Sequence, residues 1–167
     1  MARIPNNFIG INVTQPSALA AGSTTVYVPD YKLGHQIMCD SGLYVYGQAN
    51  GAVAEGYLCK YVEGVWDFDT ITSTESGSTQ TPLGISVASG ALADNQFGWF
   101  WRGLGQEFGF VTGAIATDTQ LTTTASAGIL GAGGDPVHNL FTNALSATAL
   151  CSVRSAALLE VNTTITN

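Results

Sequence analysis

Short runs of β-branched and aromatic residues, separated by turns that contain glycine, proline or aspartate, account for most of this chain. The runs "TTVYV", "HQIMCD", "LYVYGQA", "YLCKYVEGVWDF" and "LLEVNTTI" follow this pattern, which is typical of strands. No stretch has a helical period with capping residues at both ends, and only residues 140–150 could form a helix instead. Many short strands with frequent turns predict an all-β fold, a single compact β-sandwich or barrel-like domain.

A four-residue pattern recurs along the chain: a small residue, an alanine, an aliphatic residue and a second alanine. It begins at Ser17, Gly51, Gly90 and Gly113, and each time it leads through polar residues or glycine towards a strand. We expect a repeated corner in which the polar residues turn the backbone. The spacing of the copies is uneven, so they do not predict a solenoid. The aliphatic residues predicted to enter the core are Leu19, Val53, Leu92 and Ile115.

Residues 1–22 differ from the rest, because Pro5, Pro16 and a pair of asparagines interrupt isolated apolar residues. Such a segment is either disordered or an extended arm that becomes ordered on a partner. The residue types at positions 8 and 9 favour the arm. We therefore divide the chain into an extended N-terminal arm, residues 1–22, and a β-domain, residues 23–167. The predicted apolar anchors of the arm, which would contact the partner, are Ile4, Phe8 and Ile9.

The segment "NQFGWFWRGLG" places four aromatic residues between Phe97 and Trp101. In a strand, Trp99 and Trp101 share one side, and Phe100 and Arg102 lie on the other. One side fills the core, and the other is covered either by a second subunit or by the same chain. Because an unpaired charge is costly in a core, we assign Phe100 and Arg102 to a subunit interface. The Gly-Leu-Gly sequence that follows has the length of a hairpin loop.

Charged residues make up only 10% of the chain and the net charge is −7, whereas a typical soluble domain has about 25% charged residues. Such a surface suits a protein that is packed against other proteins, or is simply the polar, uncharged surface of a β-protein. The basic residues are scattered singly, so neither nucleic acid nor an anionic membrane is an expected partner. These basic residues are Arg3, Lys32, Lys60, Arg102 and Arg154.

The cysteines and the chain's apolar stretches bear on where the protein is made. Cys39, Cys59 and Cys151 are odd in number and widely spaced, so we expect free thiols and no disulfide framework. The N-terminal residues lack the long apolar core of a signal peptide, and the uncharged residues 136–153 are too polar to span a bilayer. Together these features predict synthesis in the cytoplasm.

No motif in the sequence predicts catalysis. His35 and His138 lie far apart and have no HExxH motif or paired cysteines nearby, so no metal site is expected. A GxSxG motif is missing, and the glycine-rich residues 128–135 lack the features of a phosphate-binding loop. Asp67 and Asp69 are interpreted as charges on a strand edge. We therefore predict a protein that is not an enzyme, with no catalytic residue, no metal and no cofactor.

Two stretches resemble the small decoration (cement) proteins of tailed-bacteriophage capsids. They are "PLGISVASGALADNQFGWFWRGLG" and "GAIATDTQLTTTASAGILGAGG", followed by a closing "LLEVN". In that family's pattern, a glycine and an aliphatic residue lead through an Ala-aliphatic-Ala turn to Gly-Trp and a further glycine. The resemblance covers residues 32–162, and the chain departs from it at Phe100-Trp101 and in the N-terminal arm. The matching positions are Gly84-Ile85, Ala91-Leu92-Ala93, Gly98-Trp99 and Gly103.

The resemblance implies a non-enzymatic virion protein for head stabilisation, made in the host cytoplasm and bound to the outer surface of the expanded capsid. It would bind the major capsid protein and tie neighbouring capsomers together, commonly as a homotrimer. A structural β-domain associated with the tail or baseplate shares this composition and is a second hypothesis. The third hypothesis is a carbohydrate-binding module that stacks sugars on Trp66, Trp99 or Trp101.

Overall fold

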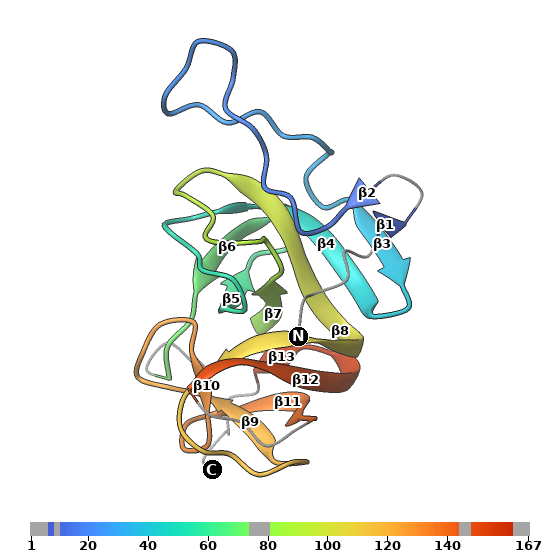
Figure 1. The fold of residues 1–167 in the computed structure, drawn as a ribbon, viewed down its shortest axis with the longest axis vertical. Coiled ribbons are helices and arrows are strands. Elements are labelled where there is room, and N and C mark those ends of the chain that lie inside the picture. The colour runs from blue at the N-terminus through green and yellow to red at the C-terminus, as the bar shows by residue number, and fades with distance from the viewer. Residues whose placement is uncertain (1–6, 9–10, 74–80, 144–147, 162–167) are drawn as a thin grey trace.

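A computed structural model describes residues 7–8, 11–73, 81–143 and 148–161, which form strands and turns without any helix (Figure 1). The prediction of an all-β fold is confirmed. Of residues 140–150, residues 140–142 and 149–150 lie in strands, and residues 143 and 148 form bends. The strands are β1 Asn7–Phe8, β2 Ile11–Asn12, β3 Gln36–Cys39, β4 Gly42–Ala49, β5 Leu58–Tyr61, β6 Asp67–Thr70, β7 Thr81–Ser86, β8 Phe97–Val111, β9 Gln120–Thr123, β10 Leu130–Gly131, β11 Pro136–Thr142, β12 Ala149–Leu158 and β13 Glu160–Val161.

Strand pairings among the described residues close two rings that share the long strand β8 (Figure 1). The first ring runs from β8 to β4, β6, β5 and β7 and back to β8. The second runs from β8 to β12, β11, β9 and β10 and back. Strand β13 links the rings, because it pairs with both β11 and β7. The mixed sheet of 11 strands is thus ring-like without being a strict barrel.

The Gly-Leu-Gly sequence at residues 103–105 does not form the predicted hairpin loop, because β8 continues through it without reversing. Gly103 (φ 110°) and Leu104 (φ 62°) have left-handed backbone conformations, and the pairing of β8 with β12 shifts register opposite them. Such a β-bulge bends a strand and increases its twist. The bend lets residues 97–103 pair in the first ring and residues 103–111 in the second.

Aromatic residues fill the interior of the first ring, and Phe100 is one of them. Phe100 is fully buried, and its ring stacks on Phe68 with centroids 3.7 Å apart and 5° between the planes. Phe68 stacks in turn on Tyr61 at 4.5 Å. A Cβ atom at Gly47 would overlap the Phe68 ring, so glycine leaves the space that this stack needs. The prediction that Phe100 faces a second subunit is therefore wrong, because strands of its own chain surround it.

The opposite side of the same strand is also covered by this chain. Trp99 and Trp101 are fully buried, as expected for the side that faces the core. Trp99 packs against Tyr31 and Tyr46, with centroid distances of 5.2 and 5.1 Å. The Trp101 indole N–H donates to the Ser41 carbonyl oxygen at 2.8 Å. The two sides of the aromatic segment thus belong to two separate core clusters of one chain.

Three of the four predicted corners place their aliphatic residue in the core. Val53 and Leu92 are fully buried and pair with each other through backbone hydrogen bonds of 2.9 and 2.7 Å. Ile115 is buried as well. In each of the four corners, the residue five positions after the first has a left-handed backbone, so the sequence repeat corresponds to a repeated turn. These residues are Gly22 (φ 78°), Gly56 (φ 79°), Asn95 (φ 62°) and Asp118 (φ 61°).

Part of the predicted N-terminal arm packs on the β-domain. Val13 is buried in the same cluster as the tryptophans. The Ser17 N–H donates to the carbonyl oxygen of the first residue of β8 at 2.9 Å, and its side-chain oxygen accepts that residue's N–H at 3.0 Å. Phe8 lies in β1, which pairs with β2, whereas Ile4 and Ile9 lie outside the described residues. The ordering of the arm on a partner stays a prediction.

Candidate interaction surface

A loop stands away from the β-domain at one end of the molecule (Figure 1). It comprises residues 18–30, between β2 and β3, and is called the projecting loop below. Two backbone hydrogen bonds cross it: the Ala20 N–H donates to the Val26 carbonyl oxygen at 2.7 Å, and the Val28 N–H donates to the Ala18 carbonyl oxygen at 3.1 Å. The projecting loop is thus a closed turn whose two limbs are held together.

The projecting loop exposes aliphatic side chains and carries no charge above its base. Leu19 is 43% exposed, Val26 58% and Val28 50%. The chain contains no charged residue between positions 11 and 29. Single exposed aliphatic residues are normal on any protein, but here three of them share one small protrusion. The centres of protein interfaces are depleted in charge, so the projecting loop is a candidate contact surface for another protein.

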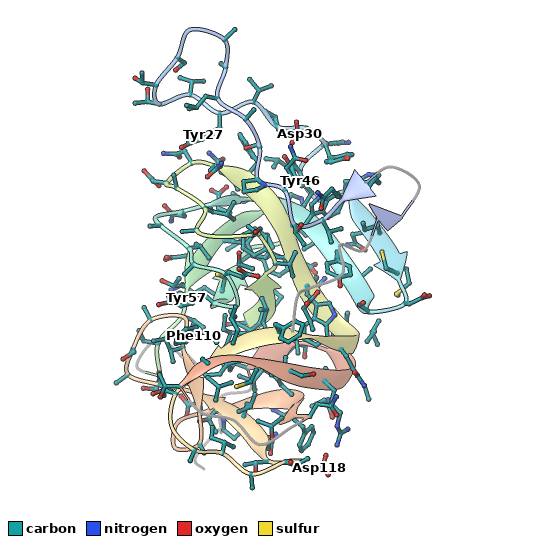
Figure 2. All side chains as sticks on the ribbon, in the orientation of Figure 1. Tyr27, Asp30, Tyr46, Tyr57, Phe110 and Asp118 are labelled. Carbon is teal, nitrogen blue, oxygen red and sulfur yellow. The ribbon has the colours of Figure 1, made fainter. Side chains whose placement is uncertain are left out.

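The base of the projecting loop is fixed to the side of the first ring that carries Tyr46 and Trp99 (Figure 2). The Asp30 N–H donates to the Tyr46 hydroxyl oxygen at 3.0 Å, and the rings of Tyr31 and Tyr46 meet edge to face at 5.2 Å. Burial raises the pKa of Tyr46 to about 12, so the hydroxyl stays neutral at physiological pH. Because Tyr31 also packs on Trp99, the buried aromatic segment supports the loop from below.

The projecting loop contains Leu19, from the copy of the repeated corner that begins at Ser17. The prediction that Leu19 enters the core is wrong. The other three copies lead directly into β5, β8 and β9, so their aliphatic residues are held against a ring. Here the chain folds back on itself, and Leu19 pairs with Tyr27 as an isolated bridge. This bridge is all that forms of the strand predicted at residues 24–28. The sequence signal for this difference is a pair of prolines: Pro16 precedes the loop and Pro29 lies near its end, and neither can donate to a strand ladder.

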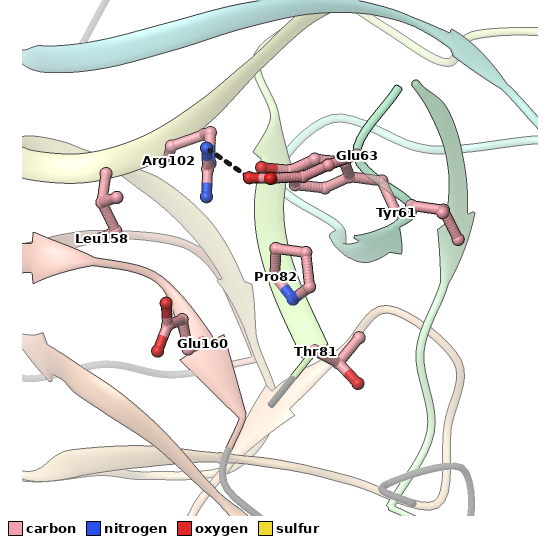
Figure 3. A pocket seen from close by; sticks show the side chains of 8 residues that line it. Tyr61, Glu63, Thr81, Pro82, Arg102, Leu158 and Glu160 are labelled. Atoms are coloured by element: carbon pink, nitrogen blue, oxygen red, sulfur yellow. Dashed lines mark ion pairs between the residues drawn. The ribbon is translucent and has the colours of Figure 1, made fainter. Parts of the chain in front are cut away.

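Arg102, predicted to lie in an interface, does not lie at the surface. Its side chain is 6% exposed, and the guanidinium lies over the Tyr61 ring, 5.0 Å from the centroid. One terminal nitrogen is 3.8 Å from a carboxylate oxygen of Glu63 (Figure 3). The prediction rested on the cost of burying an unpaired charge. The cation–π contact and the ion pair offset that cost, so the assignment of Arg102 to an exposed interface surface is corrected together with that of Phe100.

The tryptophans do not form the stacking platform that a carbohydrate-binding module needs. Trp99 and Trp101 are fully buried, so no sugar ring can reach their faces in this fold. Trp66 is partly exposed, but its ring already stacks on Tyr61 with centroids 5.5 Å apart. The carbohydrate hypothesis thus loses both tryptophans of the aromatic segment.

The described residues contain no group of three or more His, Cys, Asp or Glu side chains that could hold a metal ion. His35 instead lies beside Tyr31 and Trp99, with a centroid distance of 6.0 Å to each. Cys39, Cys59 and Cys151 form no disulfide among the described residues, and burial raises the pKa of the Cys59 thiol far above its ordinary value. Within the described residues, no helix has the length and hydrophobicity needed to cross a membrane.

No family model matches this sequence, and no curated protein matches it. A role for the projecting loop is therefore inferred from the residues of this chain.

Proposed function

We propose that this chain is a structural virion protein, a capsid decoration protein that binds the outer surface of the expanded phage head and stabilises the contacts between capsomers. The observation that carries the proposal is the projecting loop, a protrusion that exposes three aliphatic side chains and carries no charge above Asp30 at its base. The resemblance of residues 32–162 to decoration proteins supports it. The partner is the major capsid protein, and the role involves no enzymatic step.

The exposed aliphatic residues of the projecting loop set the scale of the binding energy. Burying a Val or Leu side chain completely stabilises a complex by about 1.5–3 kcal/mol relative to full exposure. Leu19, Val26 and Val28 are roughly half exposed in the free chain, so covering the remainder contributes about 1 kcal/mol each. One loop alone therefore binds weakly, and several loops must act together.

A homotrimer would bring three projecting loops to the head together, and we propose that the protein is a homotrimer when it is bound there. Closed cyclic symmetry presents three loops to three equivalent sites without open-ended growth. Such multivalency raises the overall affinity by about 10²–10⁴ without any new contact. Sedimentation of the free protein, together with its stoichiometry on the head, tests this part. Isolated single copies with no contact to a sibling at any lattice position would exclude the trimer.

The projecting loop is tested by a double substitution, Val26→Thr with Val28→Thr, which keeps side-chain shape but adds hydroxyl groups to the contact. We expect this variant to bind purified, expanded, empty heads at least tenfold more weakly in a co-sedimentation assay, since about 1.4 kcal/mol corresponds to a factor of ten. Its melting temperature should stay close to that of the wild type, because both side chains face solvent in the free chain.

The matched control is Val62→Thr with Val65→Thr, which changes two valines of comparable exposure outside the projecting loop. This control should bind heads like the wild type. Equal binding by both double variants would exclude the projecting loop as the contact. Co-purification of the protein with tails, and no binding to heads, would instead favour the tail or baseplate hypothesis.

A further inference from the structure

A pocket of about 530 Å³ opens at the end of the first ring, beside the strand β13 that links the two rings (Figure 3). Strands β5, β7, β8, β12 and β13 all contribute to it, and no residue of the projecting loop lines it. Its volume lies within the range of about 300–1,000 Å³ that is usual for ligand sites. The lining residues that matter for its chemistry are Tyr61, Glu63, Pro82, Arg102, Leu158 and Glu160.

The Arg102 guanidinium in this pocket has five N–H donors, and the described residues do not supply an acceptor for all of them. Among the described residues, its Nε has no hydrogen-bond partner. The contact with Glu63 at 3.8 Å is an ion pair that is too long for a hydrogen bond. The Tyr61 hydroxyl beside it is also buried without a partner in the described residues. Leaving buried polar groups unpaired costs free energy, so a partner that reaches the guanidinium through the pocket stabilises it.

The pocket lining carries one guanidinium, Arg102, and two carboxylates, Glu63 and Glu160. The Glu63 side chain is 67% exposed, so water screens its charge. Arg102 is almost completely buried, where an electrostatic interaction is stronger than in water. One terminal nitrogen of Arg102 faces Glu63, and a second nitrogen points away from Glu63, towards the side of the pocket lined by Leu158, Pro82 and Glu160 (Figure 3). A carboxylate is the anion that matches the planar guanidinium.

We propose that this pocket binds a carboxylate carried on a short apolar stem. The carboxylate oxygens accept N–H groups of Arg102, the stem contacts Pro82 and Leu158, and Glu63 turns towards solvent. The carboxylate comes either from a small molecule or from an acidic side chain of a partner protein, since the chemistry is the same. This inference does not depend on the proposed function, because it uses neither the projecting loop nor a phage head.

The experiment is a titration of the ¹⁵N-labelled full chain, monitored at the Nε–Hε resonances of its arginines. Sodium butanoate is the probe, and butylammonium chloride and 1-butanol are controls with the same stem. We expect butanoate alone to shift the Arg102 resonance in a saturable way. Arg154 is an internal control, because it lies outside the pocket and already forms an ion pair with Asp118 at 2.8 Å. Its resonance should not follow the same curve.

Two variants make the result specific. Glu63→Gln removes the competing carboxylate from an exposed position, so butanoate should bind at least threefold more tightly to it than to the wild type. Arg102→Met should abolish the binding. Because Arg102 is buried, this second variant could fail to fold, and the decision then rests on Glu63→Gln and on the Arg102 resonance itself.

Several outcomes would overturn the proposal. Equal binding of 1-butanol would mean that the pocket recognises only the apolar stem. Binding of butylammonium in place of butanoate would mean that Glu63 and Glu160 define the site. Weaker binding to Glu63→Gln, or no saturable shift with any probe, would also exclude it. Acetyl-glutamate methylamide separates the two sources: tighter binding than butanoate supports a protein side chain, and equal binding supports a small carboxylate.

Discussion

Replacement of Phe100 by alanine separates a core role of the aromatic segment from an interface role. The side chain is fully buried and stacks face to face on Phe68 at 3.7 Å, with its chain's own strands on every side. Removal of a buried phenylalanine side chain costs about 3–5 kcal/mol, because the transfer free energy is lost and a cavity remains. For a domain of this size, that loss lowers the melting temperature by about 6–20 °C, at about 2–4 °C per kcal/mol.

The assay for Phe100→Ala is urea unfolding followed by tryptophan fluorescence. The free energies of unfolding of the variant and the wild type are compared, and the slope of each with urea concentration should be the same. Val65→Ala is the control, since Val65 is exposed and should change stability by less than about 0.5 kcal/mol. Head binding is measured in parallel at a temperature where both variants are folded. A loss of less than about 1 kcal/mol, together with weaker head binding, would contradict the burial described above and restore Phe100 to an interface.

Two further predictions concern Tyr46 and the bend in β8. The folded chain holds the Tyr46 proton more tightly than the unfolded chain, because burial raises the pKa of Tyr46 to about 12 from an ordinary 10.0. This contribution to stability is complete below pH 10 and should be lost as the pH rises through about 12. When unfolding is measured across that pH range, Tyr46→Phe should lose less stability than the wild type, because it has no hydroxyl group to titrate. Gly103→Ala should destabilise the fold more than Gly64→Ala in urea unfolding: both glycines have positive φ, but only at Gly103 would a Cβ atom overlap a carbonyl group, that of Ala157. Equal losses in the two alanine variants would contradict the close approach at the bend.

Local patterns in the sequence predicted much of the fold correctly. The alternation of side chains along a strand placed Trp99 and Trp101 on one side, and both are buried. The repeated corner predicted buried aliphatic residues at Val53, Leu92 and Ile115, and all three lie in the core. These features depend on residues close together in the chain, so the pattern carries the information needed to predict them.

Features that depend on distant parts of the chain were not predictable in the same way. Alternation shows which residues share a side but not what covers that side, and Phe100 is covered by Phe68 from another strand. Burial of Arg102 requires Tyr61, which the sequence does not place beside it. The exposure of Leu19 likewise follows from the absence of a ring strand directly after its turn, and Pro16 and Pro29 are the local signal of this in the sequence.

The position of the projecting loop in a decorated head tests the proposed function most directly. A reconstruction of purified virions, or of expanded heads mixed with the protein, gives the location, the copy number and the face of each subunit that touches the shell. We predict subunits on the outer surface of the head, grouped in threes, with Leu19, Val26 and Val28 in contact with the major capsid protein. Subunits found on the tail, or on the head with the projecting loop in solvent, would contradict it.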